Sequence, residues 1–378
     1  SQSIGSGAHP AAIGCSPLSF EPQHPHMLSN RVAVAGLAVG AAGTVLALCW
    51  KCFARALPVA ADATSVAQIA ELWVYPIKGA GGTSVPTAAL SATGLKYDRT
   101  WVIVRDRDNK VIDLETKTIL RTVTAKVVGD RLVVTCATGV PTSITVDIDY
   151  VEEAAPEVNV VENTIPAGCR SVGDVPAKWF SAILNEDVHL MKAVRLRAPH
   201  DIAKHQGTSC SATDRVALHA YSSLHVITTE GLAWLNGAMP PSDTPRERVD
   251  AGQLRANVVI SGGKPFPDED TWDTCALHPA AADPIGLRIA KNCGRCSIPT
   301  VHANGKLDPG FEPTATLRRE RACVYPHQER NGYDKRKKEY MFGLDAFHDG
   351  TGALAVGDRV TVTSRREPPK FVRTPGSQ

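Results

Sequence analysis

The sequence predicts an α+β fold that is predominantly β and is preceded by one transmembrane helix. Short runs that alternate apolar and polar residues recur at close spacing, with Gly, Asp or Asn between them, a pattern typical of a β-barrel or β-sandwich. Few stretches repeat their apolar residues at helical spacing. Residues 32–50 form a run of nineteen residues without a charged side chain, which just spans a hydrocarbon layer of about 30 Å.

Each expected element follows from its local pattern. Strands are expected within residues 67–79, 99–115, 125–139, 143–153, 255–263 and 353–364. The range 99–115 contains a turn at 106–109, and the range 353–364 contains a strand pair about Gly357 and Asp358. An amphipathic helix is expected over 175–187, and a strand followed by a helix that ends near Gly237 over 222–239. Residues 285–305 predict a strand, a tight turn and a second, β-branched run.

The uncharged run at residues 32–50 differs in composition from the chain around it. Arg31 precedes it, Lys51 and Arg55 follow it, and Trp50 stands where an interfacial aromatic residue is expected. A membrane anchor is the preferred interpretation, and a cleaved targeting segment is the alternative. The slight basic excess after the run favours a catalytic part that faces the cytosol.

These patterns divide the chain into six parts. They are a disordered tail (1–30), the anchor (31–50), a linker (51–66), a first β-rich domain (67–195), a second β-rich domain (196–364) and a disordered tail (365–378).

Composition excludes two classes of protein. The chain of 378 residues has 41 basic and 39 acidic side chains and a formal net charge of +2, which argues against a nucleic-acid-binding protein. Its ten cysteines have no repeating spacing, so they indicate thiols in a reducing compartment rather than a disulfide scaffold.

The stretch IAKNCGRCSIPTVH, residues 289–302, holds the C-x-x-C pair Cys293 and Cys296. A zinc site would need four ligands, and His302 offers only a third. A redox dithiol would place its first cysteine at a helix N-terminus, but the residues that follow favour strand and Pro299 opposes a helix. Two interpretations remain open from these residues alone. Cys296 is a thiolate ligand for a soft metal beside the cation of Arg295, or both cysteines are ordinary turn residues.

Five motifs then occur in a specific order. LWVYPIKG, GLKYDRTW, RANVVISGGKPFPDEDTW, KNCGRC and GALAVGDRVTV together resemble the MOSC family, the proteins related to the C-terminal part of molybdenum cofactor sulfurase. The resemblance covers residues 68–363. With an anchor ahead of this part, the whole chain is similar to the mitochondrial amidoxime-reducing members of the family. It implies an N-terminal MOSC β-rich domain, a C-terminal MOSC β-barrel, and molybdopterin held between them. It also implies that Cys296 ligates the molybdenum and that Cys293 is only a neighbour.

The resemblance assigns further residues to the cofactor. Those expected to contact it are Lys78, Arg99, Ser222 (or Ser223), Arg255, Asn257 and Arg295. Without the motifs, Lys78 and Arg99 would be solvated basic side chains at strand ends. Two departures weaken the expected pterin contacts. Gly79 replaces a usual Ser, and in the stretch 111–121 an Arg is absent at its usual place, although Arg121 ends the stretch.

The resemblance implies a molybdenum-dependent reductase of N-hydroxylated compounds such as amidoximes and hydroxylamines. Two electrons and two protons would turn R–NH–OH into R–NH₂ and water at a metal held by Cys296. His219, His225 and His302 are candidate proton donors. Glu269, Asp270 and Trp272 are expected to be structural and to pair with buried basic groups.

Electrons are expected from outside the chain. It lacks a G-x-G-x-x-G after a first strand and the C-x4-C-x2-C of a ferredoxin. The resemblance implies cytochrome b5 and its NADH-dependent reductase as partners, at the mitochondrial outer membrane. The run Lys335–Lys338 is either a solvated loop or a docking patch for an acidic donor.

Two alternative functions are retained. Sulfuration of the molybdenum cofactor would require a pyridoxal-phosphate desulfurase domain, and about 66 residues precede the MOSC-like part. A carrier that binds the cofactor and hands it on would need no turnover.

Overall fold

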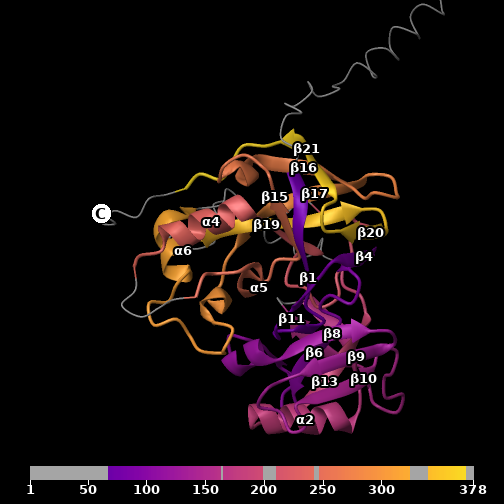
Figure 1. Cartoon of the computed structure of the whole chain (residues 1–378). Helices are drawn as coiled ribbons and strands as arrows, with labels where there is room; N and C mark the ends of the chain where they lie inside the picture. Colours follow the sequence, from indigo (N-terminus) through magenta and orange to yellow (C-terminus); the bar gives the residue numbers. More distant parts are fainter. Residues whose placement is uncertain (1–66, 163–164, 199–209, 242–246, 324–338, 372–378) are drawn as a thin grey trace, which may run out of the picture. The chain divides into compact units, whose positions relative to one another are not determined.

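The computed structural model describes residues 67–162, 165–198, 210–241, 247–323 and 339–371 (Figure 1). The expected tail, anchor and linker before residue 67 lie outside this part of the chain, as does the basic run Lys335–Lys338. Among the described residues, no helix has the length and hydropathy that crossing a membrane requires. The described part is predominantly β, as predicted.

Seven strands close into a barrel. Each pairs with the next, and the last pairs back with the first: β14 (Leu224–Thr228), β15 (Val258–Ser261), β1 (Ala67–Val74), β21 (Arg359–Arg365), β16 (Trp272–His278), β17 (Ile285–Gly294) and β19 (Glu339–Asp349). Only β14 and β15 run parallel in this ring. Closure leaves no long strand edge exposed. Leu72, Leu224, Leu287 and Leu344 are among the buried side chains that form its core.

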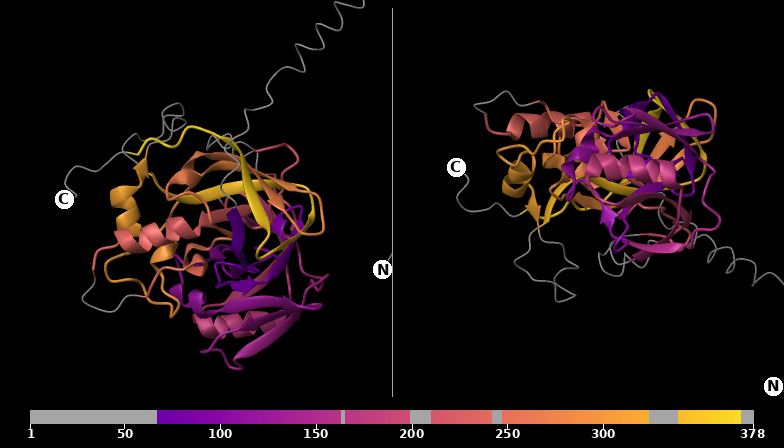
Figure 2. Two further views of the ribbon diagram at one scale, coloured as in Figure 1. Left: turned by 45° about the horizontal axis from the view of Figure 1, so that its top comes forward. Right: turned by 90° about the horizontal axis from the view of Figure 1, so that it is seen from below.

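Short elements surround the barrel. They are β3 (Thr83–Val85), β18 (Ala322–Cys323), the small sheet β20 (Gly352–Ala355), β4 (Thr87–Ser91) and β5 (Gly94–Leu95), the helices α4 (Thr229–Ala238), α5 (Ala251–Leu254) and α6 (Thr314–Glu320), and the 3-10 helices η2 (Asp268–Thr271) and η3 (Ile298–Thr300). Thr228 begins α4 because its hydroxyl accepts the N–H of Gly231 at 2.9 Å, a side-chain cap. Figure 2 shows α4 and α6 on one flank of the strands.

A second β system lies beside the barrel. Its larger sheet has the order β11 (Val158–Glu162), β12 (Ile165–Ser171), β13 (Val188–Arg195), β6 (Trp101–Arg105) and β2 (Ile77–Lys78), with β7 (Val111–Ile112) also on β6. A three-stranded meander of β8 (Thr124–Val128), β9 (Arg131–Thr135) and β10 (Ser143–Asp147), the 3-10 helix η1 (Thr118–Thr122) and α2 (Asp174–Leu184) complete it.

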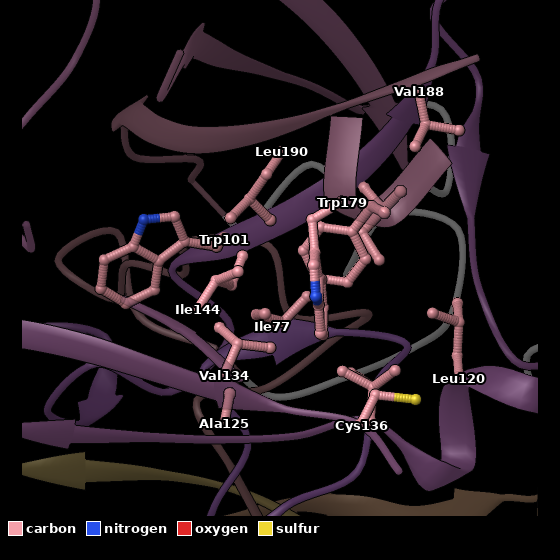
Figure 3. Close-up of a cluster of buried hydrophobic side chains, with 14 of the residues drawn as sticks. Ile77, Trp101, Leu120, Ala125, Val134, Cys136, Ile144, Trp179, Val188 and Leu190 are labelled. Atoms are coloured by element: carbon pink, nitrogen blue, oxygen red, sulfur yellow. The ribbon is translucent and has the colours of Figure 1, made fainter. Parts of the chain in front are cut away.

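The core of the second β system lies between the meander, the larger sheet and α2 (Figure 3). Trp101 is fully buried and Trp179 of α2 is nearly so. The indole Nε1 of Trp179 donates to the carbonyl of Pro141 at 2.6 Å, so this large side chain is buried with its polar atom satisfied. This packing fixes the strand ends that lead to Lys78 and Arg99.

Four details differ from the sequence-based expectations. Strand β1 belongs to the barrel, so the sheets do not divide at residue 195 as expected. Strand β19 was not predicted, although it closes the barrel. After Cys296 the chain forms η3 instead of a β run, because Pro299 is tolerated in the first turn of a helix. Strands β20 and β21 form, but they pair with β4 and with β1 and β16 rather than with each other.

The expected disordered tail is wrong for its first residues. Arg366 donates to the carbonyl of Ile289 and to Asn292 Oδ1, both at 3.1 Å. Phe371 forms a β-bridge with Cys323, and its ring centroid lies 3.8 Å from the guanidinium carbon of Arg321. The residues after 371 lie outside the described part.

Candidate functional site

A pocket of about 440 Å³ is lined by residues of the barrel and of the second β system. All seven residues that the sequence assigned to the cofactor line it: Lys78, Arg99, Ser222, Arg255, Asn257, Arg295 and Cys296. They come from five segments of the chain that are far apart in sequence, and the fold brings them together at one cavity.

Two arginines that line this pocket share one buried aromatic ring, that of Tyr75. The guanidinium carbons of Arg99 and Arg255 each lie 4.6 Å from the ring centroid of Tyr75, which allows cation–π attraction. The Tyr75 hydroxyl donates to the carbonyl of Ala256 at 3.0 Å, and burial raises the pKa of this phenol. Tyr75 is therefore a neutral platform under two cations.

Unusual backbone geometry places both arginines. Arg99 and Arg255 have φ angles of +48° and +58°, in the left-handed region that is costly for residues with a Cβ. Arg255 ends α5, and its main-chain N–H donates to the carbonyl of Gly252 at 3.3 Å. Arg99 N–H donates to the carbonyl of Tyr75 at 2.8 Å. Such strain is typical of functional positions.

Asp98 and Asn257 hold Arg99 in place. The Arg99 guanidinium pairs with Asp98 and donates to Asn257 Oδ1 at 3.0 Å. Asn257 Nδ2 donates to the carbonyl of Trp73 at 3.1 Å. Burial opposes ionisation of Asp98, but Arg99 and His219 outweigh it and hold its pKa at about 2. Since its amide is largely engaged by the protein, Asn257 positions Arg99.

Positive charge dominates the inner part of the pocket. Arg255 is so enclosed that burial, reinforced by the Arg99 and Arg121 cations, lowers its pKa to about 9. Arg121 does not line the pocket, but its guanidinium lies 3.6 Å from Asp250, and its buried Nε has no hydrogen-bond partner. An anion bound here would relieve this repulsion, so the donor set suits a phosphate or another anionic group.

The two cysteines have different environments. Cys293 is buried at 8 % exposure, and burial raises its pKa to about 12. Cys296 is exposed in the pocket. Loss of hydration raises its pKa, and the Arg295 guanidinium opposes this rise. Both cysteines line the pocket, and Cys296 is the more exposed of the two.

Comparison with known proteins identifies the two β systems. The MOSC N-terminal beta barrel domain matches residues 66–187, and the MOSC domain matches residues 213–361. The chain belongs to the MOSC-domain family. It is 28% identical to mitochondrial amidoxime-reducing component 1 of Homo sapiens over 308 residues, 78% of this chain and 82% of that protein. The Mus musculus protein of the same name is 28% identical over 90% of this chain and 93% of its own length. Molybdenum cofactor sulfurase of Oryza sativa is 23% identical, covering 75% of this chain and 32% of the sulfurase.

A three-residue cluster of potential metal ligands also lies in this MOSC pocket. Donor atoms of His225, Cys293 and Asp345 lie within 4.8 Å of one another, and all three residues are buried. Arg295 Nη1, however, contacts His225 Nε2 at 2.7 Å and Cys293 Sγ at 3.4 Å, and Lys291 Nζ lies 3.7 Å from Asp345. Two cations already face these donors and would repel a metal ion. The cluster therefore orients Arg295 beside Cys296.

The MOSC fold separates the three candidate histidines. His219 and His225 line the pocket, whereas His302 does not and contacts Asp308 at 3.2 Å. His219 Nε2 lies 3.0 Å from Asp98 Oδ2, and burial lowers its pKa. Burial and Arg295 lower the pKa of His225 well below its ordinary value. Both are neutral at pH 7 and act first as hydrogen-bonding groups.

Contacts in the structure decide between Ser222 and Ser223 and test the expected pairing of Asp270. Ser222 lines the pocket, whereas Ser223 donates to the carbonyl of Ala346 at 3.3 Å and does not line it. Asp270 accepts two bonds from Arg321, at 2.8 and 2.7 Å, which is the expected pairing with a buried cation.

The other two residues of that motif are structural as well. Glu269 accepts from the Thr228 hydroxyl at 2.9 Å. Trp272 Nε1 donates to Asp268 Oδ2 at 2.9 Å.

Sequence reasoning missed several residues that organise the cations of the MOSC pocket. Tyr75 and Asp98 contact its arginines from outside the lining, and Asp345 lines it beside Lys291; none of the three was singled out. Asp345 was missed because β19 was missed, and the signal was an acidic residue inside the apolar run MFGLDAF. Glu115 was hidden in the stretch that departs from the family pattern, and it lines the pocket.

Proposed function

We propose that this MOSC protein is a molybdenum-cofactor-dependent oxidoreductase that reduces N-hydroxylated compounds. The observation that carries the proposal is one exposed cysteine, Cys296, in a pocket lined by three half-buried arginines, Arg99, Arg255 and Arg295. Relationship to amidoxime-reducing components over most of the chain supports the substrate class.

The residues present fit an anionic pterin. Arg99, Arg255 and Lys78 would bind its phosphate end, since guanidinium forks and an ammonium suit phosphate oxygens. Cys296 would ligate the metal as a thiolate, the preferred donor for a soft metal. When bound, the molybdenum cofactor supplies a two-electron centre able to accept oxygen from the substrate.

The chain's own residues would orient the reaction. Arg295 is fixed by three contacts: His225 Nε2, Cys293 Sγ and the carbonyl of Leu254 at 2.7 Å. It therefore keeps its charge beside Cys296 and stabilises the thiolate. The low pKa of His225 keeps its imidazole neutral, so it accepts from Arg295 and does not compete for the anionic group.

The proposal extends to electron supply and location. Cytochrome b5 and its NADH-dependent reductase are proposed as donors, at the mitochondrial outer membrane with the catalytic part facing the cytosol. The support is the relationship to mitochondrial amidoxime-reducing components and the uncharged run at 32–50. An anchor on the same surface as the donor would raise the effective concentration of the two proteins.

The test combines metal analysis with turnover. We expect about one molybdenum per chain and oxidation of reduced cytochrome b5 on addition of benzamidoxime. Cys296→Ser should lose molybdenum and activity. Cys293→Ser is the matched control three residues away, and it should retain most of both. Equal loss in the two variants would contradict the assignment of Cys296.

The second candidate function is a cofactor carrier or a protein of cofactor sulfuration, which the relationship to molybdenum cofactor sulfurase supports. Protein that binds molybdopterin but does not reduce benzamidoxime or hydroxylamine would favour it.

A further inference from the structure

Glu115 stands apart from the other residues of the pocket. Of the residues that line it, only Glu115 and Cys296 are exposed, and the rest are buried or half-buried. Glu115 and Cys296 line the same pocket, and Ser297 follows Cys296 directly in the chain. Glu115 Oε1 also accepts a hydrogen bond of 3.2 Å from the hydroxyl of Ser297. One carboxylate therefore shares the solvent-exposed part of the pocket with the reactive sulfur.

The loop that carries Glu115 is held in place by backbone contacts. Asp113 Oδ1 accepts the N–H of Glu115 at 3.0 Å and the N–H of Thr116 at 3.3 Å, so the Asp113 carboxylate is used by the loop itself. A β-carbon on Gly79 would lie 2.8 Å from Asp113 Cα. Gly79 thus permits the loop to approach β2 closely. The two departures from the family pattern, Gly79 and the stretch 111–121, are in contact and together place Glu115.

The cations of the pocket are less exposed than Glu115, including Arg295 beside Cys296, which is half-buried. Arg99 has a side-chain exposure of 12%, and Lys291 is 7% exposed. These inner groups face the space that suits an anionic pterin. A substrate that approaches Cys296 from solvent therefore meets Glu115 as its exposed charged neighbour.

We propose that Glu115 is a specificity-determining residue that makes the pocket favour N-hydroxylated substrates carrying positive charge over neutral and anionic ones. This inference rests on the proposed function. Amidinium and guanidinium groups form charge-assisted hydrogen bonds to carboxylates, and the interaction is short and directional. The amidine formed from an amidoxime is protonated at pH 7, so the same carboxylate also holds the product.

The test uses three substrates with one reactive group. They are benzamidoxime, its 4-trimethylammonio derivative and its 4-carboxy derivative, assayed with the full chain containing its cofactor. We expect kcat/KM to fall in the order cationic, neutral, anionic. In Glu115→Gln the cationic substrate should lose about fivefold, the size of one unit-charge contact at about 4 Å in water, while the neutral one stays within twofold. Raising the salt concentration should reduce the preference of the wild type but not that of the variant.

Two further variants separate charge from a structural role. Ser297→Ala removes the hydrogen bond to Glu115 but keeps the charge, so it should retain the order of substrates. Glu153→Gln makes the same change in net charge at an exposed residue that does not line the pocket, and it should match the wild type. An unchanged order in Glu115→Gln would overturn the inference.

Binding of the product provides a readout apart from turnover. Benzamidine, a cation, and benzamide, its neutral analogue, are titrated into the holoprotein by calorimetry. Glu115→Gln should weaken the binding of benzamidine by about fivefold and leave the binding of benzamide unchanged. Turnover without this preference would leave the proposed function standing and refute the role of Glu115. Preferential benzamidine binding without turnover would refute the reductase and retain the cation site.

Discussion

Asn257 Oδ1 accepts a hydrogen bond of 3.0 Å from Arg99 Nη1, joining residues 158 positions apart in the sequence. The same oxygen accepts the backbone N–H of His225 at 3.1 Å. Through one side chain, the turn before β6 is tied to the starts of β14 and β15. Asn257 is 1% exposed, so these bonds are shielded from water and depend on one another.

Replacing Asn257 by Leu should therefore cost both stability and cofactor. The buried main-chain N–H of His225 and the half-buried guanidinium of Arg99 would lose their shared acceptor, and we expect the free energy of unfolding to fall by about 1–3 kcal/mol. Arg99 would lose its fixed position, so the molybdenum content per chain should fall. Urea unfolding and metal analysis measure the two effects.

Asn159 provides the matched control. Its Oδ1 also accepts from an arginine, Arg195 Nη2 at 2.6 Å, but this pair is exposed. Asn159→Leu should change the free energy of unfolding by less than about 0.5 kcal/mol. Equal effects at the two positions would mean that burial of the Asn257 bonds does not matter.

A second prediction concerns the buried pair of Arg321 and Asp270. Their side chains are 5% and 3% exposed, and Asn292 adds a hydrogen bond of 2.8 Å to the carboxylate. Arg321→Met should lower the free energy of unfolding by about 3–5 kcal/mol because it leaves a buried carboxylate unpaired. Lys178→Met breaks an exposed pair with Asp174 and should cost less than about 1 kcal/mol. Chemical denaturation of both variants measures the change in the free energy of unfolding. A change in Arg321→Met as small as that in Lys178→Met would contradict the expectation.

Local sequence pattern was sufficient for the elements that carry their own signal. The alternation in β1, the short apolar run of β6 next to a turn, the turn itself with Asn109 at φ +53° and the apolar face of α2 were all predictable from the sequence. Strand β19 was not, because its eleven residues are almost continuously buried and so show no alternation. Which strands become neighbours was also beyond the sequence, since β1 pairs with β15 and β21 nearly two hundred residues or more away.

At the site, too, some features could be predicted from the sequence and others required the folded structure. Motif order identified the residues that would meet at the pocket, and Cys296 was separated from Cys293 only through the resemblance. The physical difference between them, exposure of one sulfur and burial of the other, is a property of the folded chain. The contact of Gly79 with Asp113 likewise needed coordinates, because nothing in either segment points to the other.

A third prediction follows from the pKa of Glu269. Burial raises this pKa from 4.5 to about 7, so between these values the folded state binds a proton that the unfolded state has released. Stability from this group is therefore present at low pH and falls as the pH rises from about 4.5 to about 7. We expect the difference in unfolding free energy between wild type and Glu269→Gln to change by about 2 kcal/mol over this range, with the variant gaining relative stability at pH 8. Urea titrations at pH 5 and pH 8 measure it, and a constant difference would show that Glu269 ionises normally.

The last prediction concerns Gly79, which has φ +80° and would place a β-carbon 2.8 Å from Asp113 Cα. Gly129 also has a positive φ, of +59°, but a β-carbon there would meet nothing within 4 Å. Gly129→Ala therefore measures the backbone cost alone, about 1 kcal/mol. Gly79→Ala should cost more, by about 1–3 kcal/mol, because the loop at 113–116 must also move. That movement would carry Glu115 away from Ser297, so Gly79→Ala should weaken the preference for cationic substrates as well as the fold. Thermal or urea unfolding of both variants, with the three-substrate assay, tests the two parts together. Equal destabilisation at the two glycines would mean that the close approach of the loop has no energetic weight.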